Sequence, residues 1–241
     1  FGTWVALGDV NQDNVPDIIG ASSSGNVTAF DGSLHTPLWQ FNTNYYGNET
    51  FKVVDVEGDG NDEIIIGVDY FSVAIACYDA ATQQKLWENT DENSGVTEIG
   101  IGDPDNDGVL EFIWGSGINS TASDHLHIAG FDYYQTEWKS IDLDGPFSVG
   151  SSDVNADDTL EIVCASYQSN SGYDCGAILT YNGVDHKLLH TLFPDNWYSI
   201  ECMKLGNINE SAQDEIIVGI GSILYIFDGL TYQELMTISN N

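Results

Sequence analysis

The stretch DVEGDGNDEIIIG at residues 55–67 decides the fold, because the chain repeats its pattern of alternating acidic residues followed by an apolar run. Four related stretches occur: DVNQDNVPDIIG at 9–20, DPDNDGVLEFIWG at 103–115, DVNADDTLEIVCA at 153–165 and NINESAQDEIIVG at 207–219. Their first residues are 46, 48, 50 and 54 positions apart. Self-similarity at a nearly constant period indicates a protein built from repeated structural units.

A second pattern recurs in phase with the first. An aromatic residue followed by Asp or Asn comes after each acidic stretch: Phe30-Asp31, Tyr78-Asp79, Phe131-Asp132, Tyr181-Asn182 and Phe227-Asp228. A large residue follows a few positions later: Trp39, Trp87, Trp138, Leu189 and Met236. Each unit contains four short β-branched or aromatic segments bounded by Gly, Asn, Asp or Ser, which is typical of strands. Repeats of four strands predict a β-propeller, whose blades bury their apolar faces against one another.

We therefore predict an all-β chain with a single domain, a β-propeller of five four-stranded antiparallel blades. The blades are expected at approximately residues 1–45, 46–94, 95–144, 145–195 and 196–241. The chain begins on a first strand and ends on a fourth, so ring closure would rest on packing between blades one and five. Otherwise the five blades are part of a larger ring. The chain starts at Phe1 without a signal peptide, as a processed product or an excised piece would.

The acidic stretches are the candidate metal sites. Counted from the first residue of each stretch, oxygen side chains recur at positions one, three, five and nine, and a backbone carbonyl at position seven would add a further oxygen. The predicted ligands are Asp9, Asn11, Asp13, Val15 and Asp17 in loop one; Asp55, Glu57, Asp59, Asn61 and Glu63 in loop two; Asp103, Asp105, Asp107, Val109 and Glu111 in loop three; and Asp153, Asn155, Asp157, Thr159 and Glu161 in loop four.

Oxygen ligands alone favour calcium, which takes about six to eight of them. The loops offer no nitrogen or sulfur ligand, which argues against zinc and copper. We expect about four Ca²⁺ ions, one in each of loops one to four. Loop five, with Asn207, Asn209, Ser211 and Glu215, is neutral at three of these positions, so we expect it to be weak or empty.

The overall charge agrees with a cation-binding role. The chain has 38 acidic residues, five lysines and no arginine, for a formal net charge of -33. Such a charge opposes binding to nucleic acid or anionic lipid, and no apolar stretch approaches the ~20 residues that membrane insertion requires. A highly solvated surface would also be acidic. However, 19 of the 38 acids lie in the five loops, which such a surface does not explain.

These residues carry a family resemblance. The loop DPDNDGVLE at 103–111 resembles the FG-GAP or VCBS repeat of integrin alpha-chain β-propellers, and FDGSLHTPLW (30–39) and YDAATQQKLW (78–87) resemble the outer strands of quinoprotein-like propeller repeats. The resemblance covers nearly the whole chain. It implies calcium between the first and second strands of blades one to four, and a secreted or cell-surface location. Loop five departs from the pattern, and the family usually has seven blades.

Three functions remain open from the sequence. The leading one is an extracellular calcium-binding module for adhesion, interaction or structure, with a protein or glycan partner at a surface and self-assembly as a further option. The alternative is a carbohydrate-binding propeller that uses the aromatic residues of 42–50 or 193–199. The third is a polysaccharide-active enzyme.

The evidence for catalysis is thin. The chain has no HExxH, GxSxG or P-loop motif, and we predict no catalytic residue. His125 and His127 share one face of a predicted strand beside Asp124, which is more typical of a structural pair than of a metal or acid–base site.

The chain has four cysteines. Cys164 and Cys175 flank a turn-rich stretch, and we expect them to be bonded, which would imply an oxidising compartment; two buried thiols are the alternative. Cys77 and Cys202 lie in non-adjacent blades, and we expect them to be unpaired.

Overall fold

The computed structural model describes residues 3–68, 73–90, 95–116, 124–131, 136–143, 145–166, 176–193, 200 and 202–239. Its elements are strands, and they form five four-stranded antiparallel sheets, as predicted. Within each sheet the strands follow one another in chain order, so that every pair of neighbours is joined by one connection. Among the described residues, no helix has the length and apolar character needed to cross a membrane.

We call the sheets blades one to five. Blade one comprises β1 (Trp4–Gly8), β2 (Asp17–Ala21), β3 (Asn26–Phe30) and β4 (Pro37–Asn42). Blade two comprises β5 (Asn48–Val54), β6 (Glu63–Val68), β7 (Ile75–Asp79) and β8 (Lys85–Asn89). Blade three comprises β9 (Val96–Gly102), β10 (Glu111–Ser116), β11 (Leu126–Gly130) and β12 (Trp138–Lys139). Blade four comprises β13 (Pro146–Ser152), β14 (Glu161–Ser166), β15 (Ile178–Asn182) and β16 (Leu188–Leu192). Blade five comprises β17 (Cys202–Gly206), β18 (Glu215–Ile220), β19 (Ile223–Asp228) and β20 (Glu234–Ser239).

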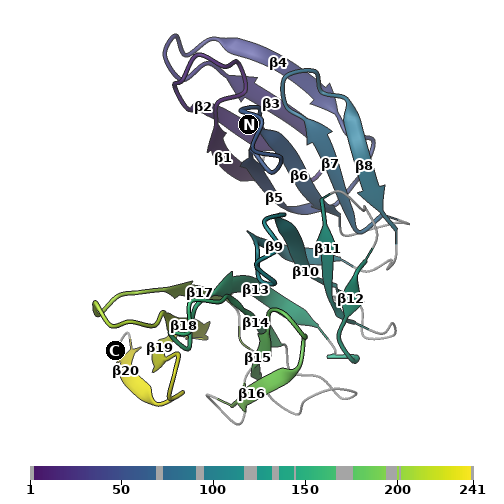
Figure 1. Ribbon diagram of the computed structural model, residues 1–241. Helices are drawn as coiled ribbons and strands as arrows, with labels where there is room; N and C mark the ends of the chain where they lie inside the picture. The colour runs from purple at the N-terminus through teal and green to yellow at the C-terminus, as the bar shows by residue number, and fades with distance from the viewer. Residues whose placement is uncertain are drawn as a thin grey trace.

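The blades follow one another along an arc, with the N-terminal and C-terminal blades at its two ends (Figure 1). The first strands of successive blades pack side by side, in the order β1, β5, β9, β13 and β17. Among the described strands, no packing of this kind joins β17 back to β1. The arc is therefore open between blades five and one.

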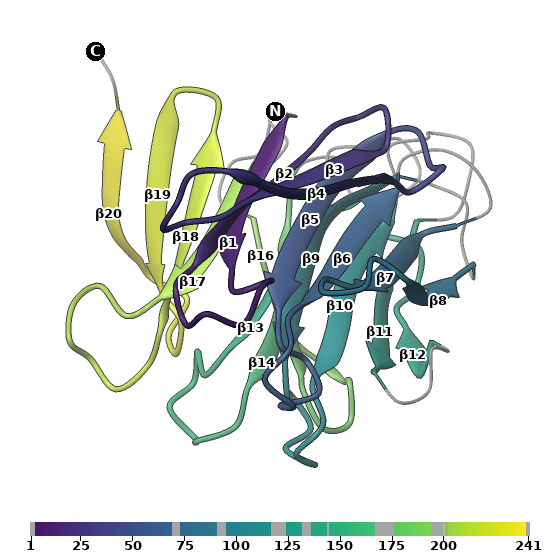
Figure 2. The ribbon, with the colours of Figure 1, turned by 90° about the horizontal axis from the view of Figure 1, so that it is seen from above.

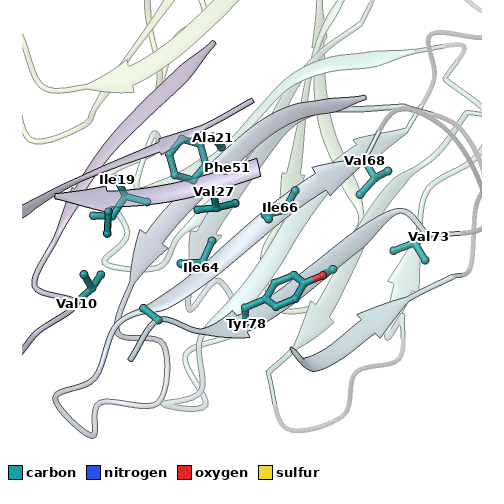
Figure 3. Packing of buried hydrophobic residues seen from close by; sticks show 13 residues of the cluster. Val10, Ile19, Ala21, Val27, Phe51, Ile64, Ile66, Val68, Val73 and Tyr78 are labelled. Atoms are coloured by element: carbon teal, nitrogen blue, oxygen red, sulfur yellow. The ribbon is translucent and has the colours of Figure 1, made fainter. Parts of the chain in front are cut away.

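Each pair of successive blades encloses its own apolar cluster. Between blades one and two, Ile19 and Val27 lie opposite Phe51 and Ile64 (Figure 3). Strands place alternate residues on opposite faces, so each middle blade has one apolar face for the preceding blade and another for the following one. This explains why β6 and β14 are buried along their whole length.

The predicted aromatic positions are largely core. Tyr78, Phe131, Tyr181 and Phe227 are buried, and the Trp87 ring centroid lies 5.0 Å from that of Phe112. The prediction for blade four was wrong by one residue. His190, and not Leu189, takes the ladder position of Trp87, because His190 and Trp87 both lie nine residues after the aromatic residue of their repeat, Tyr181 and Tyr78. His190 stacks on Tyr232, whereas Leu189 is exposed.

All five acidic loops connect the first strand of a blade to its second strand. Because the first strands run in the same sense, these connections lie together on one side of the molecule, at the lower edge of Figure 2. The fold thus gathers the most acidic segments of the chain on one face.

Candidate metal sites

The acidic loops share an unusual backbone conformation. Positions four and six have positive φ in loops one to four: Gln12, Asn14, Gly58, Gly60, Asn106, Gly108, Ala156 and Asp158. Loop five keeps this conformation at position four only, at Glu210. A residue such as Ala156 adopts positive φ at a cost of about 1–2 kcal/mol. The rest of the loop must therefore impose this shape.

The carboxylate at position one organises each loop. In loop three, Asp103 Oδ1 accepts the N–H of Asp107 at 3.0 Å, and Asp103 Oδ2 accepts the N–H of Gly108 at 3.0 Å. Asp9, Asp55 and Asp153 accept the corresponding pairs of N–H groups at 2.8–3.1 Å. These bonds draw the chain into a tight turn around the carboxylate at position one.

The carboxylate at position five fixes the next part of the turn. It accepts the N–H of position seven in all four loops, from Val15, Asn61, Val109 and Thr159, at 2.8–3.0 Å. The residue expected to contribute a carbonyl ligand is thus held close to the carboxylate at position five.

Loop three brings the predicted ligands closest together. Oxygens of Asp103, Asp105 and Glu111 all lie within 4.8 Å of one another. Glu111 is 3% exposed, and its Oε2 has no hydrogen-bond partner. Three clustered carboxylates, one of them buried with an unpaired oxygen, form an arrangement that a divalent cation would neutralise.

A proline explains why Glu111 differs from its counterparts. In loops one, two and five, the N–H of position two donates to the carboxylate at position nine, from Val10, Val56 and Ile208, at 2.8–3.1 Å. In loop three, position two is Pro104, which has no N–H. Glu111 therefore lacks the backbone donor that stabilises the other carboxylates at this position.

The pKa values of the position-nine carboxylates are raised by burial and by their acidic neighbours. Burial, followed by the nearby carboxylates Asp105, Asp103 and Asp107, raises the pKa of Glu111 to about 8. Burial also raises the pKa of Glu63 and of Glu161 to about 7, again with contributions from acidic neighbours. All three groups are easier to protonate than an ordinary glutamate, because the loops supply negative charge and little compensation.

In loop four, the side-chain amide of Asn155 donates hydrogen bonds to two of the other predicted ligands. Asn155 Nδ2 donates to Glu161 Oε1 at 2.7 Å and to Asp157 Oδ2 at 3.0 Å. Asn155 Oδ1 and Glu161 Oε2 are buried without a partner. Rotation of the amide by half a turn would direct its oxygen to the carboxylates, as a cation would require.

Loops one and two are less preorganised. Asp17 of loop one already accepts the N–H groups of Gly32 at 2.9 Å and Val10 at 3.1 Å, so both its oxygens are engaged. In loop two, both Asp59 oxygens accept the Asn61 side-chain amide at 2.9 Å, and Glu57 is exposed. The structure therefore does not bring three acidic residues together in either loop as it does in loop three.

In loop five, the residues at the predicted ligand positions form hydrogen bonds within the loop. Glu215 Oε2 accepts the Ile208 N–H at 2.8 Å, and Glu215 Oε1 accepts the Ser211 hydroxyl at 3.1 Å. Asn207 Nδ2 donates to the Ser211 carbonyl at 2.5 Å. This closed network gives a physical reason for the expectation that loop five binds calcium weakly or not at all.

The other candidate positions take part in packing. His127 is fully buried and stacks on Trp114 at 5.0 Å, and His125 Nδ1 lies 2.7 Å from the Ser140 carbonyl. In the aromatic loop at 42–50, the Tyr45 hydroxyl donates to Glu88 Oε2 at 2.5 Å across to blade two, whereas Tyr46 is exposed. Residues 194–199 lie outside the described part of the chain.

Three of the four cysteines lie in the described part of the chain, and all three are free thiols. Cys77 and Cys202 are free, as expected. Cys164 is a buried free thiol, and burial raises its pKa to about 12. Its predicted partner, Cys175, lies outside the described residues, so the described structure does not contain the predicted bond.

Sequence reasoning missed a polar cavity on the inner face of the arc. The first strands β5, β9, β13 and β17 line a space of about 370 Å³ that includes Lys52, Glu98 and Lys204. Lys204 forms an ion pair with Glu98, which also accepts the Ser148 hydroxyl at 2.6 Å. The available signal was that Lys52 and Lys204 both stand three residues before position one of their repeats.

Comparison with known proteins identifies the fold alone. No family model matches the chain, and no curated protein matches it. The crystal structure of Saccharomyces cerevisiae Sqt1 is similar, with a TM-score of 0.71 and 13% identity over 99% of this chain and 61% of that chain. The structure of the Dos1 propeller has a TM-score of 0.70 and 13% identity, over 99% of this chain and 60% of that one. The chain therefore has the β-propeller fold, and it spans about three-fifths of the length of these two structures.

Proposed function

We propose that this chain is a calcium-binding β-propeller that serves, in a secreted or cell-surface setting, as an interaction or structural module. Calcium would occupy loops one to four, with loop three as the best-formed site. The observation that carries the proposal is the cluster of Asp103, Asp105 and Glu111 around an unpaired, buried carboxylate oxygen. The fivefold repetition of the loop supports it, because one such cluster in an acidic chain would be weak evidence.

The donor set fits a hard cation. Every predicted ligand offers oxygen, from a side chain or, at position seven, from a backbone carbonyl, and the position-one carboxylate is already oriented by two backbone N–H groups. Bound calcium would neutralise carboxylates that otherwise repel one another. It would also be a partner for the Glu111 carboxylate, which receives no hydrogen bond from position two because Pro104 has no N–H. Loops one and two would need small side-chain movements to complete their shells.

The proposed location follows from the expected affinity. Calcium sites of extracellular modules bind with dissociation constants of about 10⁻⁴–10⁻³ M, whereas intracellular sensors bind more tightly. We expect the weaker range here, because the loops lie at the surface and, within the described part of the chain, only loop three already brings three carboxylates together. A net charge of -33 further favours partners that are cationic, or that are bridged by the ions themselves.

The proposed role as a binding module follows from the architecture. A propeller exposes loops and edges on a rigid frame, and the fold by itself dictates no activity. A protein partner is the leading candidate. Tyr46, an exposed aromatic residue in the turn after β4, is the observation that favours a glycan partner as the second candidate.

Calorimetric titration of the 241-residue chain with calcium tests the metal sites. We expect several ions to bind, with dissociation constants of about 10⁻⁴–10⁻³ M. The variant Glu111→Gln should lose one ion, because it removes the buried charge and preserves the shape of the side chain.

The matched control is Asp158→Asn, which removes one negative charge from position six of loop four. No ligand is predicted at this position, and Asn tolerates its positive φ. This variant should keep all the ions. A chain that binds no calcium, or a Glu111→Gln variant that binds as many ions as the control, would reject the proposed sites.

A further inference from the structure

The outer face of blade one is open, although the equivalent face of every other blade is buried. The residue four positions before each acidic loop shows the difference. Phe51, Ile99, Val149 and Met203 are 7%, 1%, 6% and 2% exposed, because each packs against the preceding blade. The equivalent residue of blade one, Val5, is 62% exposed, and Leu7 on the same face of β1 is also 62% exposed.

The opposite face of blade five is open in the same way. The residue three positions before each aromatic–Asp pair is at most 1% exposed in blades one to four, at Val27, Ile75, Ile128 and Ile178. Its equivalent in blade five, Leu224, is only half-buried. Met236 is 53% exposed, whereas Trp87 at the equivalent ladder position of blade two is 6% exposed.

The exposed residues of blade five continue into apolar rows that also contain the half-buried Ile217 and the buried Ile226. Cross-strand pairing places Ile217, Ile226 and Met236 on one face of blade five, and Gly219, Leu224 and Ile238 beside them. Part of this face forms a hollow of about 260 Å³, lined by Gly219, Leu224 and Ile238 among others. The two end faces thus repeat, in position and chemistry, the faces that form the four interfaces between blades of this molecule.

We propose that the two end faces are docking surfaces for further four-stranded blades of the same kind, carried on the same polypeptide, which close the arc into a ring. The five blades correspond to about 60% of the length of both similar structures. Propellers have about four to eight blades, so two or three further blades would complete a ring of ordinary size. This inference is independent of calcium binding.

A second copy of the chain fits these faces less well. Two five-blade arcs would form a ring larger than the four to eight blades typical of propellers. Two chains with a net charge of -33 each would also repel one another. Covalently linked blades avoid the cost of bringing separate molecules together, as they do at the four interfaces between the existing blades.

Cys202 provides a direct readout of the open face. It is exposed and free on β17, and it pairs with Gly219 in the same row as Leu224 and Ile238. A blade docked on this face would shield the thiol from a soluble reagent. The equivalent positions in blades three and four, Glu98 and Ser148, lie next to the following blade and take part in hydrogen bonds between blades.

The experiment compares alkylation of Cys202, followed by peptide mass spectrometry, in two proteins. One is the 241-residue chain, and the other carries residues 46–144 appended after residue 241, which adds copies of blades two and three. We expect the chain itself to sediment as a monomer with a reactive Cys202. In the extended protein, alkylation of Cys202 should be at least about tenfold slower, and the protein should remain monomeric.

The matched control is the same extension with Phe51→Asp and Ile64→Asp in the appended copy, which places charges on the face that would dock against blade five. It should leave Cys202 reactive. The proposal is overturned if Cys202 in the intact extended protein reacts as fast as in the shorter chain. It is also overturned if the 241-residue chain forms a dimer in which Cys202 is protected, because a second copy would then be the occupant.

Discussion

At the scale of single residues, Pro104 has the clearest chemical effect. It occupies position two of loop three, where the other loops have Val or Ile, and it removes a backbone N–H. The position-nine carboxylates Asp17, Glu63 and Glu215 accept the N–H of position two, and Glu111 has no such donor. The ligand positions one, three, five and nine were predictable from residue spacing. The effect of Pro104 was not, because it depends on a hydrogen bond between two residues that are seven positions apart in the chain.

The variant Glu111→Gln should therefore have opposite effects with and without calcium. In chelator it should raise the melting temperature, because it removes a buried carboxylate that is repelled by Asp103 and Asp105. In millimolar calcium it should lower the melting temperature, because one ion is lost. Differential scanning calorimetry under both conditions checks this. A variant that is less stable than the wild type in both would show that Glu111 is held by contacts other than an ion.

The pH dependence of the calcium-free protein follows from the same group. The pKa of Glu111 is raised to about 8 in the folded chain, above its ordinary value, so the folded state binds this proton more tightly than the unfolded state does. The resulting stabilisation is complete at acidic pH and is lost as pH rises through about 8.

In chelator, the free energy of unfolding should accordingly fall as pH rises from about 4.5 to about 8 and level off above, with further contributions from Glu63 and Glu161 up to about pH 7. Urea denaturation across this range measures the trend, and Glu111→Gln should show a smaller fall than Asp158→Asn. Stability that rises with pH over this interval would contradict the proposed role of these carboxylates.

At the scale of the element, the acidic loop behaves as a unit whose backbone shape recurs although its sequence varies. Gly58 and Gly60 indicate positive φ from the sequence, but Gln12 and Ala156 adopt the same conformation without being glycine. The hydrogen bonds to the position-one carboxylate impose it. Spacing thus revealed the loop, while the degree of preorganisation, which is high in loop three and lower in loops one and two, required the positions of the side chains.

Calcium removal should destabilise the whole fold through these loops. An ion that binds only the folded state stabilises it by about 2.7 kcal/mol at a hundredfold excess over the dissociation constant. Chelator should lower the melting temperature, and Asp107→Ala should reduce the calcium-dependent shift by about one site. The control Asp158→Asn should retain the full shift. An unchanged melting curve in chelator would contradict the proposal that the loops are structural calcium sites.

At the scale of the whole molecule, the repeat period predicted the number of blades and the number of strands in each. It could not predict whether the arc closes, because closure depends on which apolar faces remain exposed. Leu189 was predicted for the position that His190 holds, although the nine-residue spacing from Tyr78 to Trp87, repeated from Tyr181, indicates His190. The sequence repeat therefore predicts the blade, whereas closure of the arc depends on packing between blades.

The open arc yields a prediction with an internal control, because Val5 and Val149 occupy the same repeat position in blades one and four. Val149 lies in the cluster between blades three and four, whereas Val5 is exposed at the end of the arc. Val149→Asp buries a charge without a partner and should cost about 3 kcal/mol or more. Val5→Asp places its charge in water and should change the free energy of unfolding by no more than about 0.5 kcal/mol.

Urea denaturation of the two variants at one calcium concentration measures this difference. If Val5→Asp proved as costly as Val149→Asp, β1 would be covered in solution, either by blade five of the same chain or by a second molecule. Sedimentation of the wild-type chain separates these cases, because only the second raises the mass. With Val5→Asp tolerated and Val149→Asp disruptive, the arc is open in solution at blade one, and this end face is available to a further blade.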